Sequence, residues 1–406
     1  MTKRISKSTV LEVLSVLCVI LNSGGNPKVR SIAILGVSAL ALLIKKRKWT
    51  KLSTIVSLLL ISYFTLNVCI VNGSRIDIKE FVVLLIRVVC CMIIASNISF
   101  DRFFYLYIKI IVCLCCMSLF WLSLLLIGIY PPFVSYDSGI YASAFQTIGF
   151  KLSERRNSGV FSEPGLFQIH INLAFISLNY SKQCIFKKKN LVIALFVFTI
   201  LTTKSAMGYG CLLISLVTYF INNREIGHVF GSIRNRNEFV FFVGVLVLLF
   251  ELQFHVFTSF ITSWSSYTSR HDDTILGLLI ARDHPFFGIG LANNNRIIWE
   301  SYFDKLGTLS LYDPYNVGYL SDLASSNGLI NCMYQGGILF TILYSYMIIK
   351  TYIQRFFVQR WVERTAIVLF FIMVFMGEPY MLTPIFLIFI YYNKNRITLN
   401  EVSYAS

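Results

Sequence analysis

Apolar residues occur in long runs from one end of the chain to the other, and short polar segments separate the runs. Runs of this length with almost no charge are typical of helices that cross a bilayer. We predict an all-α polytopic membrane protein with about 12 transmembrane helices. The predicted spans are residues 8–22, 31–44, 52–71, 81–98, 103–129, 166–181, 190–203, 207–221, 239–256, 333–349, 365–377 and 382–392.

Composition supports a single integral membrane domain over residues 1–406. AVILMFWYC residues make up 56% of the chain and charged residues only 14%, whereas soluble domains carry about 25% charged residues. A soluble protein of this composition could not cover its surface with polar groups. Cys18, Cys90, Cys91, Cys113, Cys115 and Cys116 lie within apolar runs, where cysteine behaves as a small apolar residue. The pattern excludes a cytosolic enzyme, a secreted disulfide scaffold and a disordered chain.

The net charge of +16 predicts topology rather than nucleic-acid binding. Lys and Arg are denser in the short segments on the N-terminal side of the predicted spans than in the longer segments on the other side. Cytoplasmic loops carry such an excess. We therefore expect a bacterial inner membrane protein with both termini in the cytoplasm and no nucleic-acid partner.

Two outer segments are much longer than the others, at residues 130–165 and 257–332. The second contains the apolar run 275–281, preceded by Asp272 and Asp273, and acidic residues favour a helix N-terminus. Many aromatic residues accompany this run. We expect a partly helical periplasmic cap on the outer interface; the alternative is that the aromatic residues form only an interfacial belt.

The chain holds no Walker, GxSxG or HExxH motif, so candidate chemistry rests on polar residues of the outer segments. Arg155 and Arg156 are not explained by retention of basic loops inside the cell. Arginine pairs with phosphate oxygens through a planar fork, which suits a diphosphate ester in the outer leaflet. The alternative is a solvated loop in which Glu154 pairs with one of them.

Other outer residues have a chemical and a structural interpretation, and both stay open. Arg282, Asp283 and His284 follow one another, and the histidine suits a general base or a loop contact. Lys204 lies between two short spans and either contacts phosphate or extends to the interface. Asn327 either binds a sugar hydroxyl or caps the next helix. We expect no metal ion and no cofactor.

Two carboxylates, Glu163 and Glu378, each precede a proline and an apolar span. A carboxylate at the edge of the membrane is costly unless it is hydrated or paired. Each one either pairs with an arginine or accepts a proton.

Four segments together resemble the O-antigen polymerase (Wzy) group, which shares a superfamily with the O-antigen ligases. They are RRNSGVFSEPG from residue 155, LTTKSAMGYG from 201, HPFFGIG from 284 and SSNGLINCMYQGGI from 325. The ligases' His-Asn pair reads Ser326-Asn327 here, which favours a polymerase. Their Ser-Arg pair reads Lys204-Ser205, which assigns the basic role to Lys204. Arg296 and Gly307 fit the family's Arg-x10-Gly spacing.

The resemblance implies a glycosyltransferase that works on the periplasmic face. Two polyprenyl-diphosphate-linked oligosaccharides meet, and the growing chain leaves its carrier for the non-reducing end of the new unit. Neither nucleotide nor metal is needed. Candidate bases are Glu163, His284 and Glu378, in that order. Candidate residues for diphosphate and sugar are Arg155, Arg156, Lys204, Arg282, Arg296 and Asn327.

The resemblance also implies two kinds of partner besides the substrate, which are membrane lipid and a protein that sets chain length. Two other functions stay open. One is an O-antigen ligase that transfers glycan to lipid A-core. The other is a transporter or flippase of lipid-linked sugar, which would have interrupted helices and charges within its spans; Arg87 is the clear charge of that kind.

Overall fold

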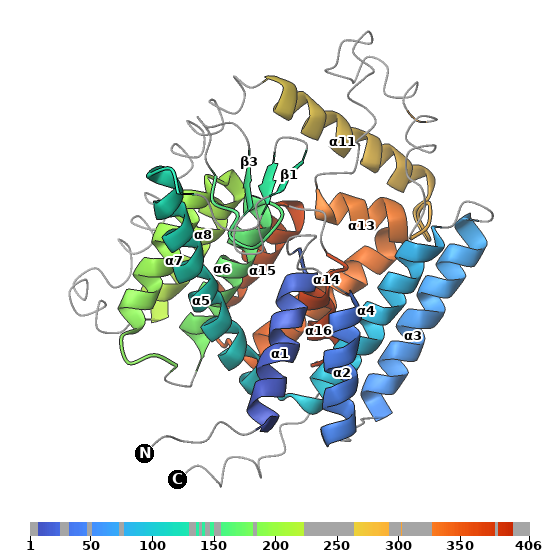
Figure 1. The fold of residues 1–406 in the computed structure, drawn as a ribbon. Coiled ribbons are helices and arrows are strands. Elements are labelled where there is room, and N and C mark those ends of the chain that lie inside the picture. The colour runs from blue at the N-terminus through green and yellow to red at the C-terminus, as the bar shows by residue number, and fades with distance from the viewer. Residues whose placement is uncertain are drawn as a thin grey trace.

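The computed structural model describes residues 7–24, 32–46, 51–72, 77–129, 135–137, 140–142, 147–149, 156–181, 185–222, 264–291, 302, 327–377 and 381–392, and helices dominate it (Figure 1). The helices are α1 (Lys7–Asn22), α2 (Ile32–Lys46), α3 (Lys51–Asn67), the π-helical turn η1 (Val68–Asn72), α4 (Ile78–Asn97), α5 (Phe100–Leu126), α6 (Pro164–Tyr180), α7 (Lys189–Thr203), α8 (Ala206–Asn222), α11 (Trp264–Asp283), α13 (Gly328–Gly336), α14 (Ile338–Arg355), α15 (Trp361–Gly377) and α16 (Pro384–Tyr391).

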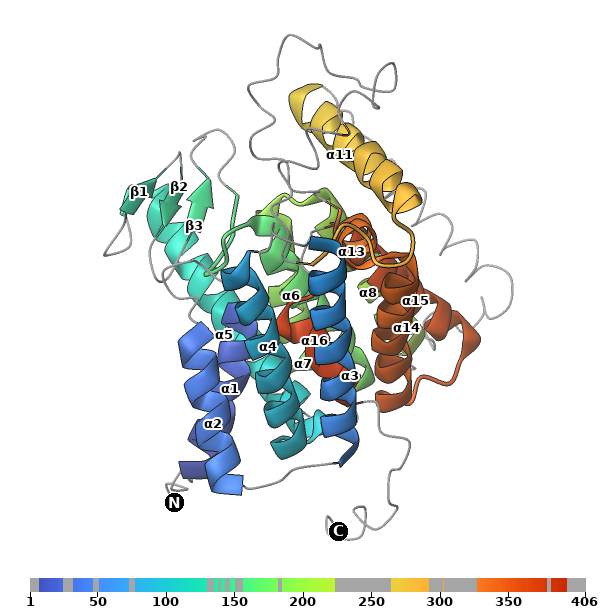
Figure 2. The same ribbon diagram turned by 90° about the vertical axis from the view of Figure 1, so that its right-hand side faces the viewer.

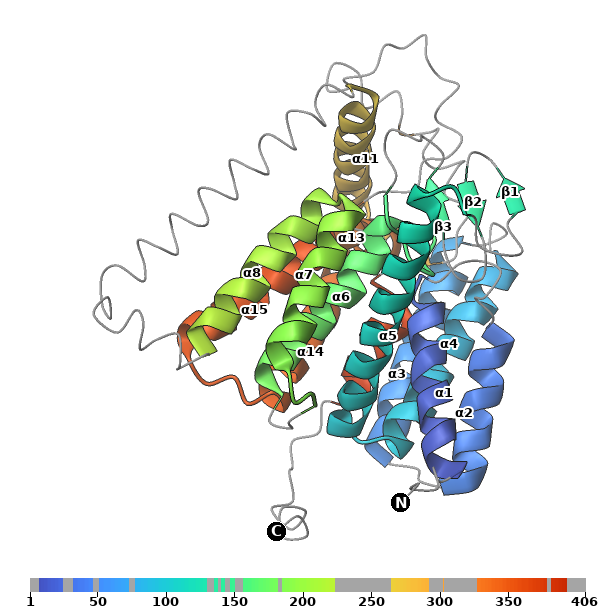
Figure 3. The ribbon, with the colours of Figure 1, turned by 60° about the vertical axis from the view of Figure 1, so that its left-hand side comes forward.

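The helices form a bundle in which two groups flank a buried centre (Figures 1 and 3). In one group α2 packs between α1 and α4, and α3 packs on α4. In the other group α6 packs on α5, α7 and α8, and α15 covers α8. Helix α16 packs on α4 and α14, and every residue of α16 is buried. The central helices are therefore those with the fewest exposed side chains.

One end of the bundle is marked by α11, which lies across it and packs on α13 (Figures 1 and 2). We name this the α11 end and the other the opposite end. Helix α4 runs from the α11 end to the opposite end, whereas α5 runs back. Helix α6 begins at the α11 end, where Pro164 occupies its first turn. Backbone N–H groups in the first turn have no acceptor within the helix, so the missing N–H of proline costs no hydrogen bond there.

Central packing in the second group relies on polar contacts along α6. Asn172 donates from Nδ2 to the Gly208 carbonyl oxygen of α8 at 3.1 Å, and Asn179 donates to the Ser215 carbonyl oxygen at 3.0 Å. Gly208 has Gln168 of α6 directly beside it. Small residues allow helices to approach, and polar side chains join them, which is a common arrangement between helices in a bilayer.

Helices occupy the predicted spans wherever the structure describes them, which confirms the helical character of the fold. Two of these helices, Lys51–Val71 and Phe100–Leu126, are long and apolar enough to cross a membrane by length and composition alone. Thr9–Asn22, Lys189–Thr203 and Ala206–Phe220 are apolar but shorter. The predicted span 239–256 lies outside the described residues.

The structure differs from the predicted elements in three places. Helix α11 begins at Trp264, so Asp272 and Asp273 lie within it and not at its N-terminus. The predicted span 333–349 is divided between α13 and α14 at Gly337, whose φ of 90° is a conformation that favours glycine. Within the predicted loop 130–165, three short antiparallel strands form a sheet, namely β1 (Ser135–Asp137), β2 (Ile140–Ala142) and β3 (Thr147–Gly149). Tyr136 pairs with Tyr141, which pairs with Ile148, and these residue types favour extended chain.

Candidate functional site

A cavity of about 250 Å³ lies at the α11 end, where α1, α4 and α13 meet the segment that precedes α16. Its lining combines charged, amide and hydroxyl side chains with apolar ones, a combination typical of ligand sites. The polar lining residues are Asn22, Glu80, Arg87, Asn331, Gln335 and Thr383, and the others are Gly24, Leu84, Leu291, Gly328, Cys332, Met381 and Leu382.

The floor of the cavity is the N-terminus of α16, which begins deep within the bundle. The Pro384 carbonyl oxygen accepts a hydrogen bond from the Cys91 Sγ at 3.5 Å. Cys91 lies 13 residues after the start of α4, which is roughly 20 Å along the helix axis. The Ile385 N–H donates to the Ser23 Oγ at 2.8 Å. Helix N-termini carry a partial positive charge, and the N–H groups of Ile385, Phe386 and Leu387 already have acceptors within the protein.

Arg87 adds a full positive charge near that helix end. It lines the cavity, is half-buried, and precedes Cys91 by one turn of α4. Thr383, directly before α16, also lines the cavity. Only 5% of Thr383 is exposed, and its Oγ1 has no hydrogen-bond partner among the described residues. A cation, a helix N-terminus and a buried hydroxyl group therefore surround the floor of the cavity.

Glu80 lies near the mouth of the same cavity, two helical turns before Arg87 on α4. The Glu80 side chain is exposed, and its backbone N–H donates to Asp77 Oδ1 at 3.1 Å. Glu80 was not predicted as a site residue. The signal that pointed to Arg87 was its charge within an apolar run, but only the fold shows that both residues share a cavity.

The HPFFGIG motif connects α11 to the wall of the cavity. Backbone N–H groups of Ile289 and Gly290 donate to the carbonyl oxygens of Tyr334 and Gln335 at 2.7 and 3.1 Å. Gly288 has a φ of 63°, and a Cβ there would meet the Tyr334 carbonyl oxygen. These contacts attach the chain after α11 to α13, and Leu291, the residue directly after the motif, lines the cavity.

His284, the first residue of that motif, and Arg282 before it are exposed and do not line the cavity. The Arg282 guanidinium pairs with the Asp283 carboxylate at 3.1 Å. The His284 ring lies 6.5 Å from the ring of Tyr302. Burial of Tyr302 raises the pKa of its hydroxyl group, and the neighbouring Asp283 raises it further. In this cluster Arg282 and His284 are exposed, whereas Tyr302 is buried.

The structure brings Arg156 and Lys204 together at the junction of α7 and α8. Arg156 donates from Nε to the Thr203 carbonyl oxygen at 3.2 Å. Lys204 ends α7 in the left-handed conformation, with a φ of 49°, and its side chain is exposed. Asn157 joins the same junction through the Thr202 Oγ1 at 2.9 Å. Neither basic residue lines the cavity.

Glu163 and Asn327 lie beside residues of the cavity wall. Glu163 is exposed at the start of α6 and makes no side-chain capping bond; the preceding Ser162 donates from its N–H to the Gly24 carbonyl oxygen at 3.2 Å. Asn327 caps α13, because its Oδ1 accepts from the N–H groups of Leu329 and Ile330.

Three other predicted site residues, Arg155, Arg296 and Glu378, lie outside the described residues. In the part of the chain that the structure describes, there is no group of three or more His, Cys, Asp and Glu side chains that could hold a metal ion.

Comparison of the chain with family models, with curated proteins and with solved structures found no match. The described residues therefore form a helical bundle with a cavity at one end that is lined by charged and polar side chains, and two of its helices are long and apolar enough to cross a membrane. The resemblance to O-antigen polymerases stays a prediction.

Proposed function

We propose that this chain is an O-antigen polymerase, a multi-pass glycosyltransferase of the bacterial inner membrane with about 12 transmembrane helices. It joins polyprenyl-diphosphate-linked oligosaccharide units at the α11 end, which faces the periplasm. The observation that carries the proposal is the cavity lined by Arg87 and by Thr383, the residue directly before α16.

The distribution of basic residues supports this orientation. Among the described residues, basic side chains gather at the opposite end, where α2 ends and α3, α5, α7 and α15 begin. They are Lys45, Lys46, Lys51, Arg102, Lys187, Lys188, Lys189, Arg355, Arg360 and Arg364. Fewer lie at the α11 end. Since cytoplasmic segments carry the excess of Lys and Arg, the opposite end belongs in the cytoplasm.

The chemistry of the proposed reaction fits the charged floor. The bond between the anomeric carbon and the diphosphate breaks, and negative charge develops on the diphosphate. A cation and a helix N-terminus stabilise such charge in a site shielded from water. One donor of this kind contributes roughly 3 kcal/mol to the transition state. Arg87 takes the role that was predicted for the arginines of the outer loops.

The size of the cavity sets which part of the substrate it encloses. About 250 Å³ lies below the range of about 300–1,000 Å³ for pockets that enclose a drug-sized ligand. The cavity therefore holds the diphosphate and the sugar joined to it, while the rest of the glycan extends past α11 and the polyprenyl tail stays in lipid.

The experiment is complementation of a strain that lacks the gene, with lipopolysaccharide resolved by length. Wild-type protein restores a ladder of chain lengths, whereas Arg87→Ala leaves a single capped unit. A wild-type ladder from stably expressed Arg87→Ala would contradict the proposed role of the cavity. Complete loss of capped lipopolysaccharide in the deletion strain would instead indicate a ligase.

One observation favours a second candidate function, a flippase of lipid-linked sugar. Arg87 within α4 and the start of α16 inside the bundle are features that transporters use at their binding sites. Purified protein in vesicles distinguishes the two functions. A polymerase lengthens lipid-linked glycans on one face of the bilayer, whereas a flippase moves them across it without lengthening.

A further inference from the structure

We propose that Glu80 is the general base of the transfer and acts opposite Arg87 in the same cavity, an inference that rests on the proposed function. The Glu80 carboxylate takes the proton of the acceptor hydroxyl group. The acceptor oxygen then forms its bond to the anomeric carbon of the donor. The bond from that carbon to the diphosphate oxygen breaks, and its electron pair leaves with the diphosphate beside Arg87.

The spacing of the two residues suits this reaction. Glu80 and Arg87 lie seven residues apart on α4, and residues separated by two turns share one helix face. Their Cα atoms are therefore roughly 10 Å apart along the axis. A base, an acceptor oxygen, an anomeric carbon and a leaving phosphate need a span of this order, because general acid–base contacts take about 3 Å each. Glu80 stands at the mouth and Arg87 near the floor.

Amide side chains between these charges provide contacts for the acceptor sugar. Asn22, Asn331 and Gln335 line the cavity with Glu80, and an amide both donates and accepts hydrogen bonds, as a sugar hydroxyl group does. The Asn331 Oδ1 is buried and has no hydrogen-bond partner within the described ranges. Such a group is costly unless a ligand or another partner satisfies it.

The three bases predicted from the sequence are less well placed than Glu80 to reach a substrate in the cavity. Among the described residues that line the cavity, Glu80 is the carboxylate. His284 is exposed beside Tyr302, outside that lining. Glu163 is exposed at the start of α6, where it adjoins the rim without lining the cavity. Glu378 lies outside the described residues.

A structural role for Glu80 must be separated from a chemical one. Asp77 caps α4 and Glu80 is the third residue of that helix, the position at which Glu or Gln completes a capping box. Glutamine keeps the size and capping ability of Glu80 but cannot accept a proton near neutral pH. Glu80→Gln therefore isolates the proton transfer. Asp77→Asn is a matched control, because asparagine caps helices as well as aspartate does.

The test uses full-length protein in nanodiscs and lipid-linked units extracted from a strain that lacks the gene. We expect Glu80→Gln to lower kcat by about 10²–10⁴-fold, the range for general-base catalysis, while KM and the unfolding temperature stay unchanged. Formate should restore part of the activity of Glu80→Ala, and the acidic limb of the pH profile of kcat should disappear. Asp77→Asn should match wild type.

The outcomes separate this inference from the proposed function. Wild-type kcat in Glu80→Gln, or the same loss in Glu163→Gln instead, overturns the role of Glu80 and leaves the polymerase standing. Loss of activity without rescue by formate and with a lower unfolding temperature shows a capping role only, which also overturns it. A wild-type protein that makes no polymer overturns both.

Discussion

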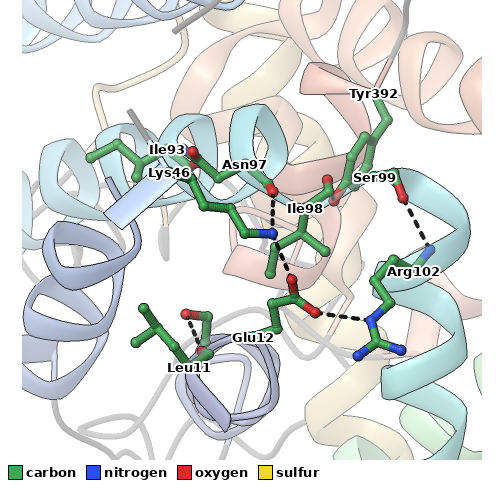
Figure 4. Close-up of polar contacts among 10 residues, drawn as sticks. Leu11, Glu12, Lys46, Ile93, Asn97, Ile98, Ser99, Arg102 and Tyr392 are labelled. Atoms are coloured by element: carbon green, nitrogen blue, oxygen red, sulfur yellow. Dashed lines mark hydrogen bonds and ion pairs between the residues drawn. The ribbon is translucent and has the colours of Figure 1, made fainter. Parts of the chain in front are cut away.

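The two ends of the bundle each hold a glutamate and an arginine, but the two pairs have different surroundings. At the opposite end Glu12 of α1 contacts two cations, and all three charges are paired (Figure 4). At the α11 end Glu80 and Arg87 line an open cavity. The first arrangement joins helices, whereas the second leaves room for a ligand.

The Glu12 cluster shows what a purely structural ion pair looks like in this fold. Its Oε1 lies 2.5 Å from the Lys46 Nζ and its Oε2 lies 2.9 Å from the Arg102 Nε. Lys46 also donates to the Asn97 carbonyl oxygen at 3.1 Å. Glu12 is only 8% exposed. The cluster thereby ties α1, α2, α4 and α5 together, and its three charged residues do not line the cavity at the α11 end.

The difference between the two ends separates charges that stabilise the fold from charges that are candidates for function. A buried charge is expensive unless it is paired, and Glu12 meets that condition within the protein. The cavity combines a cation, a helix N-terminus and buried oxygens of Asn331 and Thr383 without a described partner. A ligand with hydroxyl groups would satisfy these two oxygens.

The largest effect is expected from Arg87→Ala. Loss of one transition-state donor should lower the rate of glycan elongation by about 10²–10³-fold, while the unfolding temperature in detergent stays within a few degrees of wild type. Arg102→Ala is the control at the opposite end: it should lower the unfolding temperature and leave the rate of glycan elongation unchanged. If both variants lost stability and kept activity, the distinction between the two ends would be wrong.

Next in size is the effect of Glu12→Gln on stability. Removal of one partner of a buried ion pair costs about 3–5 kcal/mol. The cations keep 24% and 35% of their side chains exposed, so we expect about 2–3 kcal/mol after allowance for solvent screening. Thermal unfolding in detergent measures this. Glu363→Gln is the control, because its pair with Arg360 is longer, at 3.8 Å, and should matter less.

Gly288→Ala should destabilise the contact between the HPFFGIG motif and α13 by about 2 kcal/mol. A left-handed backbone costs a residue with a side chain about 1–2 kcal/mol, and the added Cβ meets the Tyr334 carbonyl oxygen. Gly36→Ala in α2 is the control, since nothing lies within 4 Å of its Cβ position. Equal unfolding temperatures for the two variants would show that the HPFFGIG motif does not hold α13.

The smallest effect is expected from Arg282→Ala. Its pair with Asp283 is exposed, and pairs of this kind contribute about 0–1 kcal/mol. Because Arg282 does not line the cavity, glycan elongation should stay within about threefold of wild type, which is within about 1 kcal/mol. A loss as large as that of Arg87→Ala would return the diphosphate site to the outer loop.

The helices could be predicted from sequence because each follows a run of apolar residues. The division at Gly337 was missed, since a positive φ follows from the packing of Gly337 on Phe286 and not from hydropathy. The depth of α16 was missed for a similar reason, because it depends on contacts with Ser23 and Cys91. The β-strands are too short to show a pattern against their apolar surroundings.

None of the described residues that were predicted for the site lines the cavity. Arg87 stands out as a charge in an apolar run, but its relation to α16 depends on residues nearly 300 positions apart in the chain. Asn327 caps α13 next to Gly328 of the cavity wall, so one motif did point to the neighbourhood. Glu80 has the appearance of an ordinary residue of a helix start, because nothing local distinguishes a capping glutamate from a base.

The central claim, that the floor of the cavity binds diphosphate, is tested most directly by the affinity of the purified protein for polyprenyl diphosphate. We predict that Arg87→Ala weakens this affinity by at least about tenfold, consistent with the loss of one charged hydrogen bond, while Arg282→Ala binds as wild type does. Equal affinity of wild type and Arg87→Ala would contradict the account.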